Sequence, residues 1–461
     1  MRRHVVVIGG GVAGLGAATA LAERDIEVTL FEARPSAGGR CSTFTDPATG
    51  ERVDNGQHVL IGCYDETFQL LRRVGATAHV AIQPNLALRI IDRCGDASIL
   101  RCPAWPAPLH LLGGLLSWKA LSWRDRLASI RLLPALRGVG RGPTDVGRVP
   151  LDPADRATVR AWLVEHGQTE RLVSLLWEPL AVAALNQSID AAAAGVFREV
   201  VRRMFTTDRR DSSLVFPTVP LHELFVEPSL ALLQRHGGRM IASAPARVVL
   251  DQGAVAVRTR DSQLRPDAIV CAVPWHALPD VLPDVVELRE TIAAANATAS
   301  SPIVTVNLWL DRDVLSDSFV GLPGRHMQWV FDKGRLFGEG AAHLSLVSSG
   351  AAEILSRSNE ALVALAWDEL RAAVPAANSA AVRRAVVVRE RRATFSLAPG
   401  QPPRPATATA VPGLFLAGDW IDTGLPATIE SAVLSGHRAA AAVRAYLNHS
   451  PDDRVTGKQR H

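Results

Sequence analysis

The stretch VVVIGGGVAGLGAATALA, residues 5–22, joins an apolar run to an alanine-rich run through a cluster of glycines. Residues 4–8 have the length and composition of a buried strand, and residues 12–24 those of a helix. Residues 27–31 (EVTLF) alternate in the manner of a second strand, which completes a β-α-β unit. The sequence therefore predicts an α/β fold of Rossmann type around a parallel sheet.

The glycines of this stretch have the spacing of a dinucleotide-binding turn, with Gly9, Gly11 and Gly14 in the pattern G-x-G-x-x-G. Such glycines permit the tight turn, let a pyrophosphate approach the backbone and allow the helix to pack on the sheet. Glu32 ends the second strand about 20 residues further on, where a carboxylate accepts hydrogen bonds from a ribose. A glycine-rich turn without a ligand is the alternative, but the position of Glu32 favours a dinucleotide.

The composition is that of a globular protein. With 461 residues, 48% of them hydrophobic, the chain is long enough for two domains. The net charge of +4 is spread thinly, so we expect no nucleic-acid binding. The five cysteines have neither a C-x-x-C pair nor zinc-finger spacing, which predicts buried thiols in a reducing cytoplasm and no metal site. No apolar run reaches the roughly 18 residues of a membrane-spanning helix, so a soluble or peripheral protein is expected.

Further elements follow from periodicity and from Gly/Pro breaks. One or two amphipathic helices are predicted in residues 105–137, followed by a break at 138–153 in which Asp152 caps a helix that has Pro153 in its first turn. Residues 153–204 are predicted to be helical throughout, except for an interruption near 186–190. The remaining predicted helices are 221–236, 358–373 and 427–447, and the predicted strands are 245–250, 254–259, 268–273, 303–310, 327–331, 343–348, 385–390 and 413–417.

Two segments resemble the FAD motifs of the flavin amine oxidase and phytoene desaturase superfamily. They are ARPSAGGRCST (residues 33–43) and LFLAGDWIDTGLPATIESAVLSGHRAA (residues 414–440). The resemblance implies FAD as the cofactor, with Gly38, Gly39 and Arg40 against its diphosphate. Val248, in APARVVLDQGAVAV (residues 244–257), matches the strand whose backbone meets the adenine.

The second motif also has a physical interpretation. Asp419 ends a strand and is placed to accept hydrogen bonds from a ribityl chain, and the helix that starts near Ala427 directs its free N–H groups at the electron-rich end of a flavin. The full set of predicted FAD ligands is Gly9, Gly11, Gly14, Glu32, Arg34, Gly39, Arg40, Val248, Gly418, Asp419, Ala427, Thr428 and Ile429.

These three stretches predict a discontinuous domain organisation. Residues 1–75, 230–285 and 405–447 are expected to form an FAD-binding domain of the glutathione-reductase type, amine oxidase subgroup. Residues 76–229 and 286–404 are expected to form a discontinuous α+β substrate-binding domain, and residues 448–461 a polar tail.

Five segments, the last of which lies within the second FAD motif, resemble the bacterial hydroxysqualene dehydroxylases, the squalene-associated FAD-dependent desaturase family. They are VDNGQHVLIGCYDET (53–67), PAPLHLLGGLLSWKALSWRDRL (106–127), LWEPLAVAALN (176–186), QWVFDKG (328–334) and AGDWIDTGLPATIESAVLSG (417–436). The resemblance implies reductive dehydroxylation of hydroxysqualene to squalene in squalene and hopanoid biosynthesis, by protonation of the allylic hydroxyl and hydride transfer from the N5 atom of reduced flavin. It also implies association with the upstream enzymes of the squalene pathway.

This chemistry needs an acid near the flavin. His58 is the first candidate, because an imidazolium has a pKa near neutral pH; Gln57 is expected to orient the alcohol or the flavin edge, and Asp54 to set the charge of His58 or to cap the turn. The alternative is that His58 only bonds a backbone carbonyl or the flavin. Asp332 and Asp422 are rival acids, each with a turn or cap role as the alternative.

Other activities of the same fold stay open. Tyr64 and Tyr446 are the only tyrosines, and GLPATIE stands where an amine oxidase carries an aromatic residue, which disfavours amine oxidation. A carotenoid desaturase has the same flavin geometry, with the hydride travelling the other way. A prenyl-lipid-binding protein without flavin is a third hypothesis, although its cofactor motifs are expected to be degraded and here they are intact.

A thirty-carbon isoprenoid alcohol needs a route from the bilayer. Residues 105–133 mix Leu and Trp with Arg and Lys, which is typical of a segment in the headgroup zone. We therefore expect peripheral contact with the inner, cytoplasmic face of the cell membrane, involving Leu116, Trp118 and Trp123; a helix pair packed on the substrate domain is the alternative. Trp329 and Phe331 fit either a tunnel wall or the core, and Trp177 and Glu178 are equally ambiguous.

Overall fold

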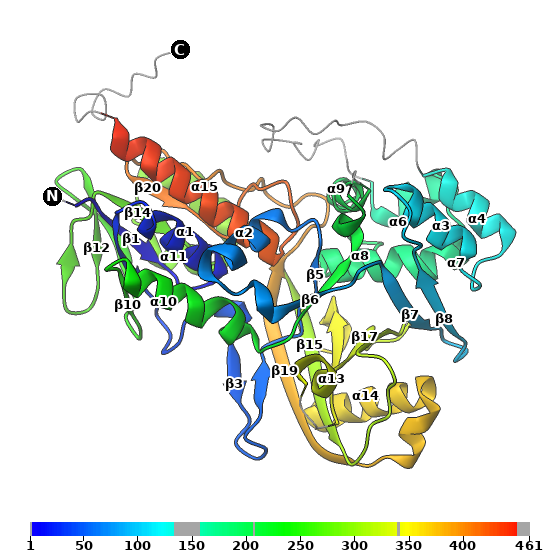
Figure 1. Cartoon of the computed structure of the whole chain (residues 1–461). Coiled ribbons are helices and arrows are strands. Elements are labelled where there is room, and N and C mark those ends of the chain that lie inside the picture. The colour runs from blue at the N-terminus through cyan, green and yellow to red at the C-terminus, as the bar shows by residue number, and fades with distance from the viewer. Residues whose placement is uncertain (1, 133–156, 206–207, 339–341, 450–461) are drawn as a thin grey trace.

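The computed structural model describes residues 2–132, 157–205, 208–338 and 342–449 (Figure 1). The predicted break at 138–153, the helix start at Asp152 and Pro153, and nearly all of the polar tail lie outside these residues. Within the described ranges, none of the helices is both long enough and apolar enough to cross a membrane.

A five-stranded sheet forms one end of the molecule, and every pair of neighbouring strands in it is parallel. Its order is β10 (Arg239–Ile241), β2 (Glu27–Phe31), β1 (His4–Ile8), β14 (Ala268–Cys271) and β20 (Leu414–Leu416). Apolar residues of β1 are buried on both faces, as parallel sheets require. The predicted Rossmann-like α/β fold is confirmed. Strand β10 was missed, because three residues that begin with an exposed arginine carry little signal.

Helices cover one face of this sheet and a small antiparallel sheet covers the other. Val5 and Val7 of β1 pack with α1 (Val12–Ala22) and α15 (Ile429–Asn448). These two helices lie side by side in Figure 1, and a Cβ atom on Gly436 would meet the Ala13 carbonyl oxygen at 2.2 Å, so their backbones nearly touch. Val6 and Ile8 face β11 (Arg247–Asp251), β12 (Ala254–Arg258) and β13 (Gln263–Leu264).

A second, mixed sheet forms the lower part of the molecule in Figure 1. Its order is β19 (Val382–Phe395), β15 (Ser300–Leu310), β18 (His343–Ser349), β17 (Trp329–Asp332), β16 (Phe319–Gly321), β7 (Ala87–Ile91) and β8 (Ala97–Arg101). Alternate residues of β15, such as Val304 and Val306, pack against α14 (Asn359–Ala373). The alternation leaves the opposite face of the sheet to residues such as Thr305 and Asn307.

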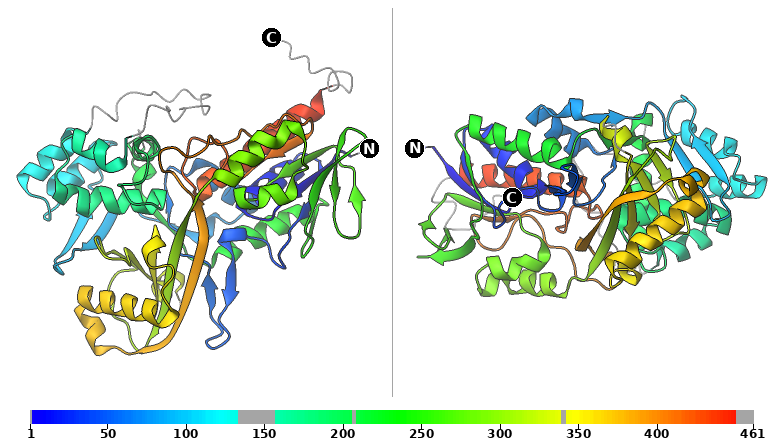
Figure 2. Two further views of the ribbon diagram at one scale, coloured as in Figure 1. Left: turned by 180° about the vertical axis from the view of Figure 1, so that it is seen from behind. Right: turned by 90° about the horizontal axis from the view of Figure 1, so that it is seen from below.

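A helical region adjoins β7 and β8, as the two views of Figure 2 show. The interruption predicted near residues 186–190 is confirmed, because α8 (Glu178–Leu185) ends there and Asn186 adopts a left-handed conformation with φ +51°. The prediction of an otherwise continuous helix is wrong at residues 157–158, which precede α6 (Val159–Glu165) and where Thr158 is extended, and at residues 166–169, where Gly167 has φ +65°. The helices are α3 (Leu109–Ser117), α4 (Trp123–Ile130), α6 (Val159–Glu165), α7 (Glu170–Leu172), α8 (Glu178–Leu185) and α9 (Ala194–Met204).

The remaining elements connect these parts. A hairpin is formed by β3 (Thr43–Thr45) and β4 (Arg52–Asp54), and a three-stranded sheet by β5 (Leu60–Ile61), β9 (Leu214–Pro217) and β6 (Val80–Ile82). The other helices are α2 (Asp65–Val74), α10 (Glu227–Arg235), α11 (Leu278–Val281), α12 (Arg289–Ala297) and α13 (Lys333–Phe337).

Candidate active site

The predicted cofactor residues gather at one edge of the parallel sheet. Because all its strands run in the same direction, the residues that follow β1, β2 and β20 emerge together at the carboxyl edge, where ligands of such sheets bind. These residues are the turn 9–14, Glu32 and the pair Gly418–Asp419.

Each of the three motif glycines is needed for a different structural reason. Gly9 has φ +106°, and a Cβ atom there would lie 2.6 Å from the Ala272 carbonyl oxygen. A Cβ atom on Gly14 would lie 1.9 Å from the Gly9 carbonyl oxygen. Gly11 instead has φ −70°, and a Cβ atom there would have no neighbour within 4 Å. Gly11 therefore leaves open space beside the N-terminus of α1, which no side chain caps, and this space fits a diphosphate.

Glu32 closes the glycine turn in this structure. Its carboxylate, only 8% exposed, accepts hydrogen bonds from the Gly10 N–H at 2.7 Å and from the Arg34 N–H at 2.8 Å. The Arg34 side chain is exposed to solvent. The Glu32 carbonyl accepts from the Ala244 N–H at 2.9 Å, so the segment that precedes β11 runs beside Glu32. Val248 is buried in β11, opposite Val257 of β12.

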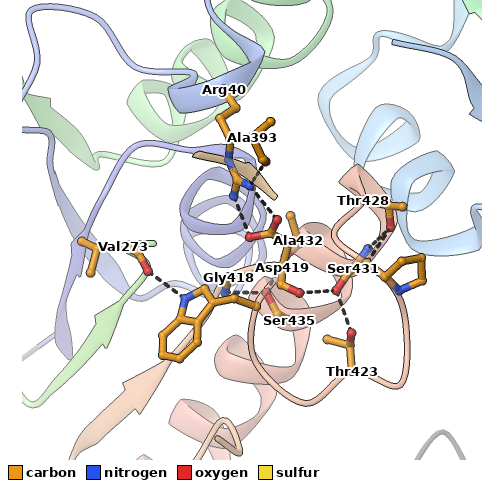
Figure 3. Close-up of polar contacts among 12 residues, drawn as sticks. Arg40, Val273, Ala393, Gly418, Asp419, Thr423, Thr428, Ser431, Ala432 and Ser435 are labelled. Atoms are coloured by element: carbon orange, nitrogen blue, oxygen red, sulfur yellow. Dashed lines mark hydrogen bonds and ion pairs between the residues drawn. The ribbon is translucent and has the colours of Figure 1, made fainter. Parts of the chain in front are cut away.

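Arg40 and Asp419 form a bidentate ion pair that joins the two FAD motifs (Figure 3). The guanidinium donates to the two carboxylate oxygens at 2.7 and 2.6 Å and to the Ala393 carbonyl at 2.7 Å, which also ties it to β19. Gly39 lies against Gly11, because a Cβ atom on Gly39 would be 3.3 Å from the Gly11 Cα. The structure thus brings together the segment after β2, the turn after β1 and the C-terminal motif.

Hydroxyl groups hold the C-terminal motif to the start of α15 (Figure 3). The Gly418 N–H donates to Ser435 Oγ at 2.8 Å, and Ser431 Oγ donates to the Asp419 carbonyl at 2.9 Å. Thr428 caps the helix by accepting from the Ser431 N–H at 3.2 Å. The predicted contact residues are placed here as well: Ala427 and Thr428 are partly exposed and Ile429 is buried.

Gln57 and His58 lie in a loop between two short strands. β4 ends at Asp54, β5 begins at Leu60, and residues 55–59 join them. His58 Nδ1 lies 2.8 Å from the Gly56 carbonyl, which can only accept, so this nitrogen carries the proton. Burial lowers the pKa of His58 below its ordinary value, while the hydrogen bond to Gly56 and the charge of Asp54 oppose that shift.

Lys333 is a member of this site that the sequence interpretation missed. Its ammonium donates to Asp54 Oδ2 at 3.0 Å and to Gln57 Oε1 at 2.6 Å, and lies 3.8 Å from the centre of the Phe337 ring. The lysine is only 2% exposed, and a lysine is rarely so buried unless it is paired. The available signal was a lone lysine two positions after the apolar run WVF (residues 329–331), in a chain with three lysines.

The two rival acids are engaged in local structure. Asp332 caps α13 by accepting from the Arg335 N–H at 3.0 Å, and its other oxygen accepts from Arg335 Nε at 3.1 Å. Burial raises the pKa of Asp332. Asp422 is partly exposed and lies 3.8 Å from an Arg404 nitrogen. Asp332 thus has the cap role that was its alternative, whereas Asp422 lies in a bend between β20 and α15.

An aromatic cluster lies next to the loop. Trp329 and Phe331 project from the sheet face opposite α14, and the Phe319 ring lies 5.0 Å from the Trp329 ring and 4.8 Å from the Phe331 ring. Val59, which follows His58, packs on this cluster. Trp177, by contrast, is buried against Phe197 in the helical region and belongs to the core. Glu178 is partly buried, and burial raises its pKa.

Comparison with known proteins identifies the family. The family model described as flavin containing amine oxidoreductase matches residues 12–444. The chain belongs to this family. The flavoprotein is therefore an FAD-dependent oxidoreductase, and the predicted cofactor class is confirmed.

The curated relatives match the flavoprotein over nearly the whole of both chains. A protein of Rhodopseudomonas palustris named hydroxysqualene dehydroxylase is 31% identical, covering 96% of this chain and 99% of that one. The protein of that name from Sinorhizobium fredii is 28% identical, covering 95% and 98%. A 15-cis-phytoene desaturase of Synechococcus elongatus is 25% identical, covering 95% of each. The expected resemblance to the hydroxysqualene dehydroxylases is confirmed.

A solved structure supports the fold of the flavoprotein. An oxidoreductase from Methanosarcina mazei superposes with a TM-score of 0.73, at 16% identity, over 95% of this chain and all of that one.

Proposed function

We propose that this flavoprotein removes the allylic hydroxyl of hydroxysqualene reductively to give squalene, in the formation of squalene and hopanoids. The observation that carries the proposal is the similarity to proteins named for this reaction, which covers almost the whole chain and exceeds that to the phytoene desaturase. When bound, reduced FAD supplies the hydride; the protein must supply the binding site, an acid and an apolar surface.

The proposed FAD site consists of the turn 9–14, Glu32 and Arg34, Gly39 and Arg40, Val248, Gly418 and Asp419, and residues 427–429. We also propose the domain division 1–75, 230–285 and 405–447 against 76–229 and 286–404. All five parallel strands come from the first set and all seven strands of the mixed sheet from the second, which supports this division.

His58 is the proposed proton donor. Because Gly56 holds Nδ1–H, the Nε2 atom is the one that gains and loses the proton. In the proposed step this proton passes to the hydroxyl oxygen, the C–O bond breaks, and the oxygen leaves as water. A lowered pKa makes the imidazolium a stronger acid but a less populated one at neutral pH.

The aromatic cluster is the proposed wall of the hydrocarbon site. Loss of water leaves an allylic cation, and the faces of aromatic rings attract cations. Trp329, Phe331 and Phe319 lie beside Val59 and thus close to the residue proposed as the acid. This placement supports a role of the rings in binding the polyene and the developing charge.

Residues 105–133, of which the structure describes 105–132, are the proposed membrane contact at the cytoplasmic face. Six large apolar side chains are at least one third exposed there: Trp105, Leu109, Leu116, Trp123, Leu127 and Ile130. Trp123 and Leu127, 66% and 52% exposed, stand one helical turn apart on α4, and Trp105 also lines a surface hollow with Gly113 and Ser117. The expectation for Trp118 is wrong, because its side chain is 1% exposed and its indole N–H donates to Ser98.

This contact suggests how the substrate arrives. We propose that the isoprenoid enters from the bilayer beside Trp105, and that the upstream squalene-pathway enzymes deliver it to the same membrane.

Product analysis tests the proposed reaction. The photoreduced protein is incubated anaerobically with hydroxysqualene, and the oxidised protein separately with phytoene or with squalene. We expect squalene from the first incubation and no new product from the second. A desaturated product from the second incubation alone would identify a carotenoid-type desaturase instead.

A further inference from the structure

The loop of residues 55–59 lies between the cofactor motif and the mixed sheet. Asn55 Nδ2 donates to the Arg40 carbonyl at 3.4 Å and to a Glu390 carboxylate oxygen of β19 at 3.1 Å. Gly56 lies beside β15, because a Cβ atom there would be 4.0 Å from Thr305 Oγ1. Residues 55–59 are all partly accessible, whereas Asp54 and Leu60 on either side are buried. The loop therefore borders an accessible space on the cofactor side of the sheet.

Lys333 holds this loop through an ion pair sealed from solvent. The Lys333 and Asp54 side chains are 3% and 5% exposed. Asp54 also accepts from Thr43 Oγ1 at 2.7 Å and from the Leu221 N–H at 3.0 Å. A buried charge is tolerated only with such partners. The position of the ammonium is therefore fixed by Asp54 of the β3–β4 hairpin as well as by the lysine's own backbone at the start of α13.

This ammonium determines which end of the Gln57 amide it contacts. An ammonium has donors and no acceptor, so the Gln57 atom 2.6 Å from Lys333 Nζ must be the carbonyl oxygen. The NH₂ group then stands at the other end of the amide, where its contact with the His58 carbonyl is long, at 3.4 Å. Without the ammonium only this long contact with the His58 carbonyl would distinguish the two ends of the amide.

We propose that Lys333 is a positioning residue that turns the Gln57 amide so that its NH₂ group donates a hydrogen bond to the oxygen of the allylic alcohol. The inference rests on the proposed function and deepens it, because it assigns the recognition of the hydroxyl to a particular donor. Lys333 acts through Gln57, and His58 keeps its separate role in proton transfer.

Equilibrium binding to the oxidised holoenzyme, which has no hydride to give, tests the inference without turnover. Dissociation constants for hydroxysqualene and squalene are measured in the same detergent by quenching of tryptophan fluorescence. We expect the wild type to bind the alcohol about tenfold more tightly than the hydrocarbon, as one hydrogen bond allows. Gln57→Glu keeps an acceptor for Lys333 but removes the NH₂ group, and should lose the preference while retaining FAD and the affinity for squalene.

The lysine is tested together with its partner, because Lys333→Met alone leaves a buried unpaired carboxylate. The double variant K333M/D54N should lose the preference for the alcohol and keep bound FAD and the affinity for squalene. In a Gln57→Leu background the same double change should alter the preference less than about twofold. Lys333 acts only through the Gln57 amide, so its effect should disappear when that amide is absent. Phe337→Leu, which changes the ring under the ammonium, is the matched control and should keep the preference.

Two results would overturn the inference at different levels. A wild type that prefers the alcohol and a K333M/D54N protein that keeps this preference would remove Lys333 from the recognition of the hydroxyl. A wild type that binds both molecules equally would refute the recognition of the hydroxyl by Gln57, and the inference with it, whereas the proposed reaction fails only if product analysis yields no squalene.

Discussion

The turn after β1 and the loop of residues 55–59 are held by contacts of very different range. The hydrogen bond from Gly10 to Glu32, which closes the turn, spans 22 residues. The bonds from Lys333 to Gln57 and Asp54, which hold the loop, span 276 and 279 residues. The turn is thus defined within one β-α-β unit, whereas the loop takes its conformation from a sheet formed much later in the chain.

This difference corresponds to the work each region does. A diphosphate needs backbone N–H groups and room, which a short glycine segment provides by itself. A reaction centre needs a few side chains at defined orientations, and those are held by partners from other elements. Variants in the first region should therefore act on the cofactor, and variants in the second on the chemistry.

Substitutions of Gly11 and Gly14 should have the largest effects. Together they distinguish a glycine that leaves room for a ligand from one that the packing of the protein requires. Gly11→Ala places a methyl group in open space, so the fold should survive while the FAD content falls by about tenfold or more. Gly14→Ala pushes a methyl group into a backbone carbonyl 1.9 Å away, so folding itself should fail. Flavin absorbance per protein and circular dichroism measure both. Normal FAD content in Gly11→Ala would mean that the space beside α1 does not hold the cofactor.

His58 tests whether the loop acts on chemistry and not on cofactor binding. His58→Ala should lower kcat by about 10²- to 10⁴-fold, with FAD content unchanged. Because the pKa of His58 is lowered by burial, kcat/KM of the wild type should rise as the pH falls below 6.5, as the active imidazolium becomes populated. His79→Ala, at an exposed histidine, is the control. If His58→Ala leaves both the pH profile and kcat unchanged, another group must be the proton donor.

Glu430 forms a second long-range contact, between α15 and α2, whose contribution to stability can be tested by varying the pH. Its carboxylate is 2% exposed and accepts from the Thr67 N–H at 2.9 Å and from Thr67 Oγ1 at 2.7 Å. Burial raises the pKa of Glu430 to about 7 from the ordinary 4.5.

The folded state therefore binds this proton more tightly than the unfolded state. The resulting stability is complete below pH 4.5 and is lost as the pH rises through about 7. Between pH 5 and pH 8 the wild type should lose a few kcal/mol more than Glu430→Gln, which does not titrate. Urea denaturation midpoints at the two pH values measure this difference. Equal losses in both proteins would contradict the raised pKa.

The smallest effect is expected at three exposed apolar residues that lie outside both regions: Trp105, which precedes α3, and Trp123 and Leu127 of α4. Changing Trp105, Trp123 and Leu127 together to serine should weaken binding to liposomes by about tenfold or more and leave FAD content unchanged. Val286→Ser is the matched control, because Val286 is 67% exposed but lies elsewhere in the chain. Unchanged sedimentation with liposomes would favour a helix pair that only packs on its own domain.

Sequence reasoning succeeded where the signal was local. The β-α-β unit, the interruption after Leu185 and the long helix α15 each follow from periodicity or a capping residue within a few positions. It failed at residues 166–169, where one glycine ended a helix. It also failed at Trp118, which lies in a segment with exposed apolar residues but is itself buried in the core. Composition describes a segment, whereas burial is decided side chain by side chain.

The residues of this chain by themselves predicted a dinucleotide-binding β-α-β unit with a parallel sheet, because the glycine spacing and Glu32 belong to one continuous stretch of sequence. Only the tertiary structure decided that Gln57 and His58 stand in a loop, that Arg40 pairs with Asp419, and that a buried lysine orients the Gln57 amide. A charge can be buried only where partners from distant strands converge on it, and that convergence leaves no local pattern in the sequence.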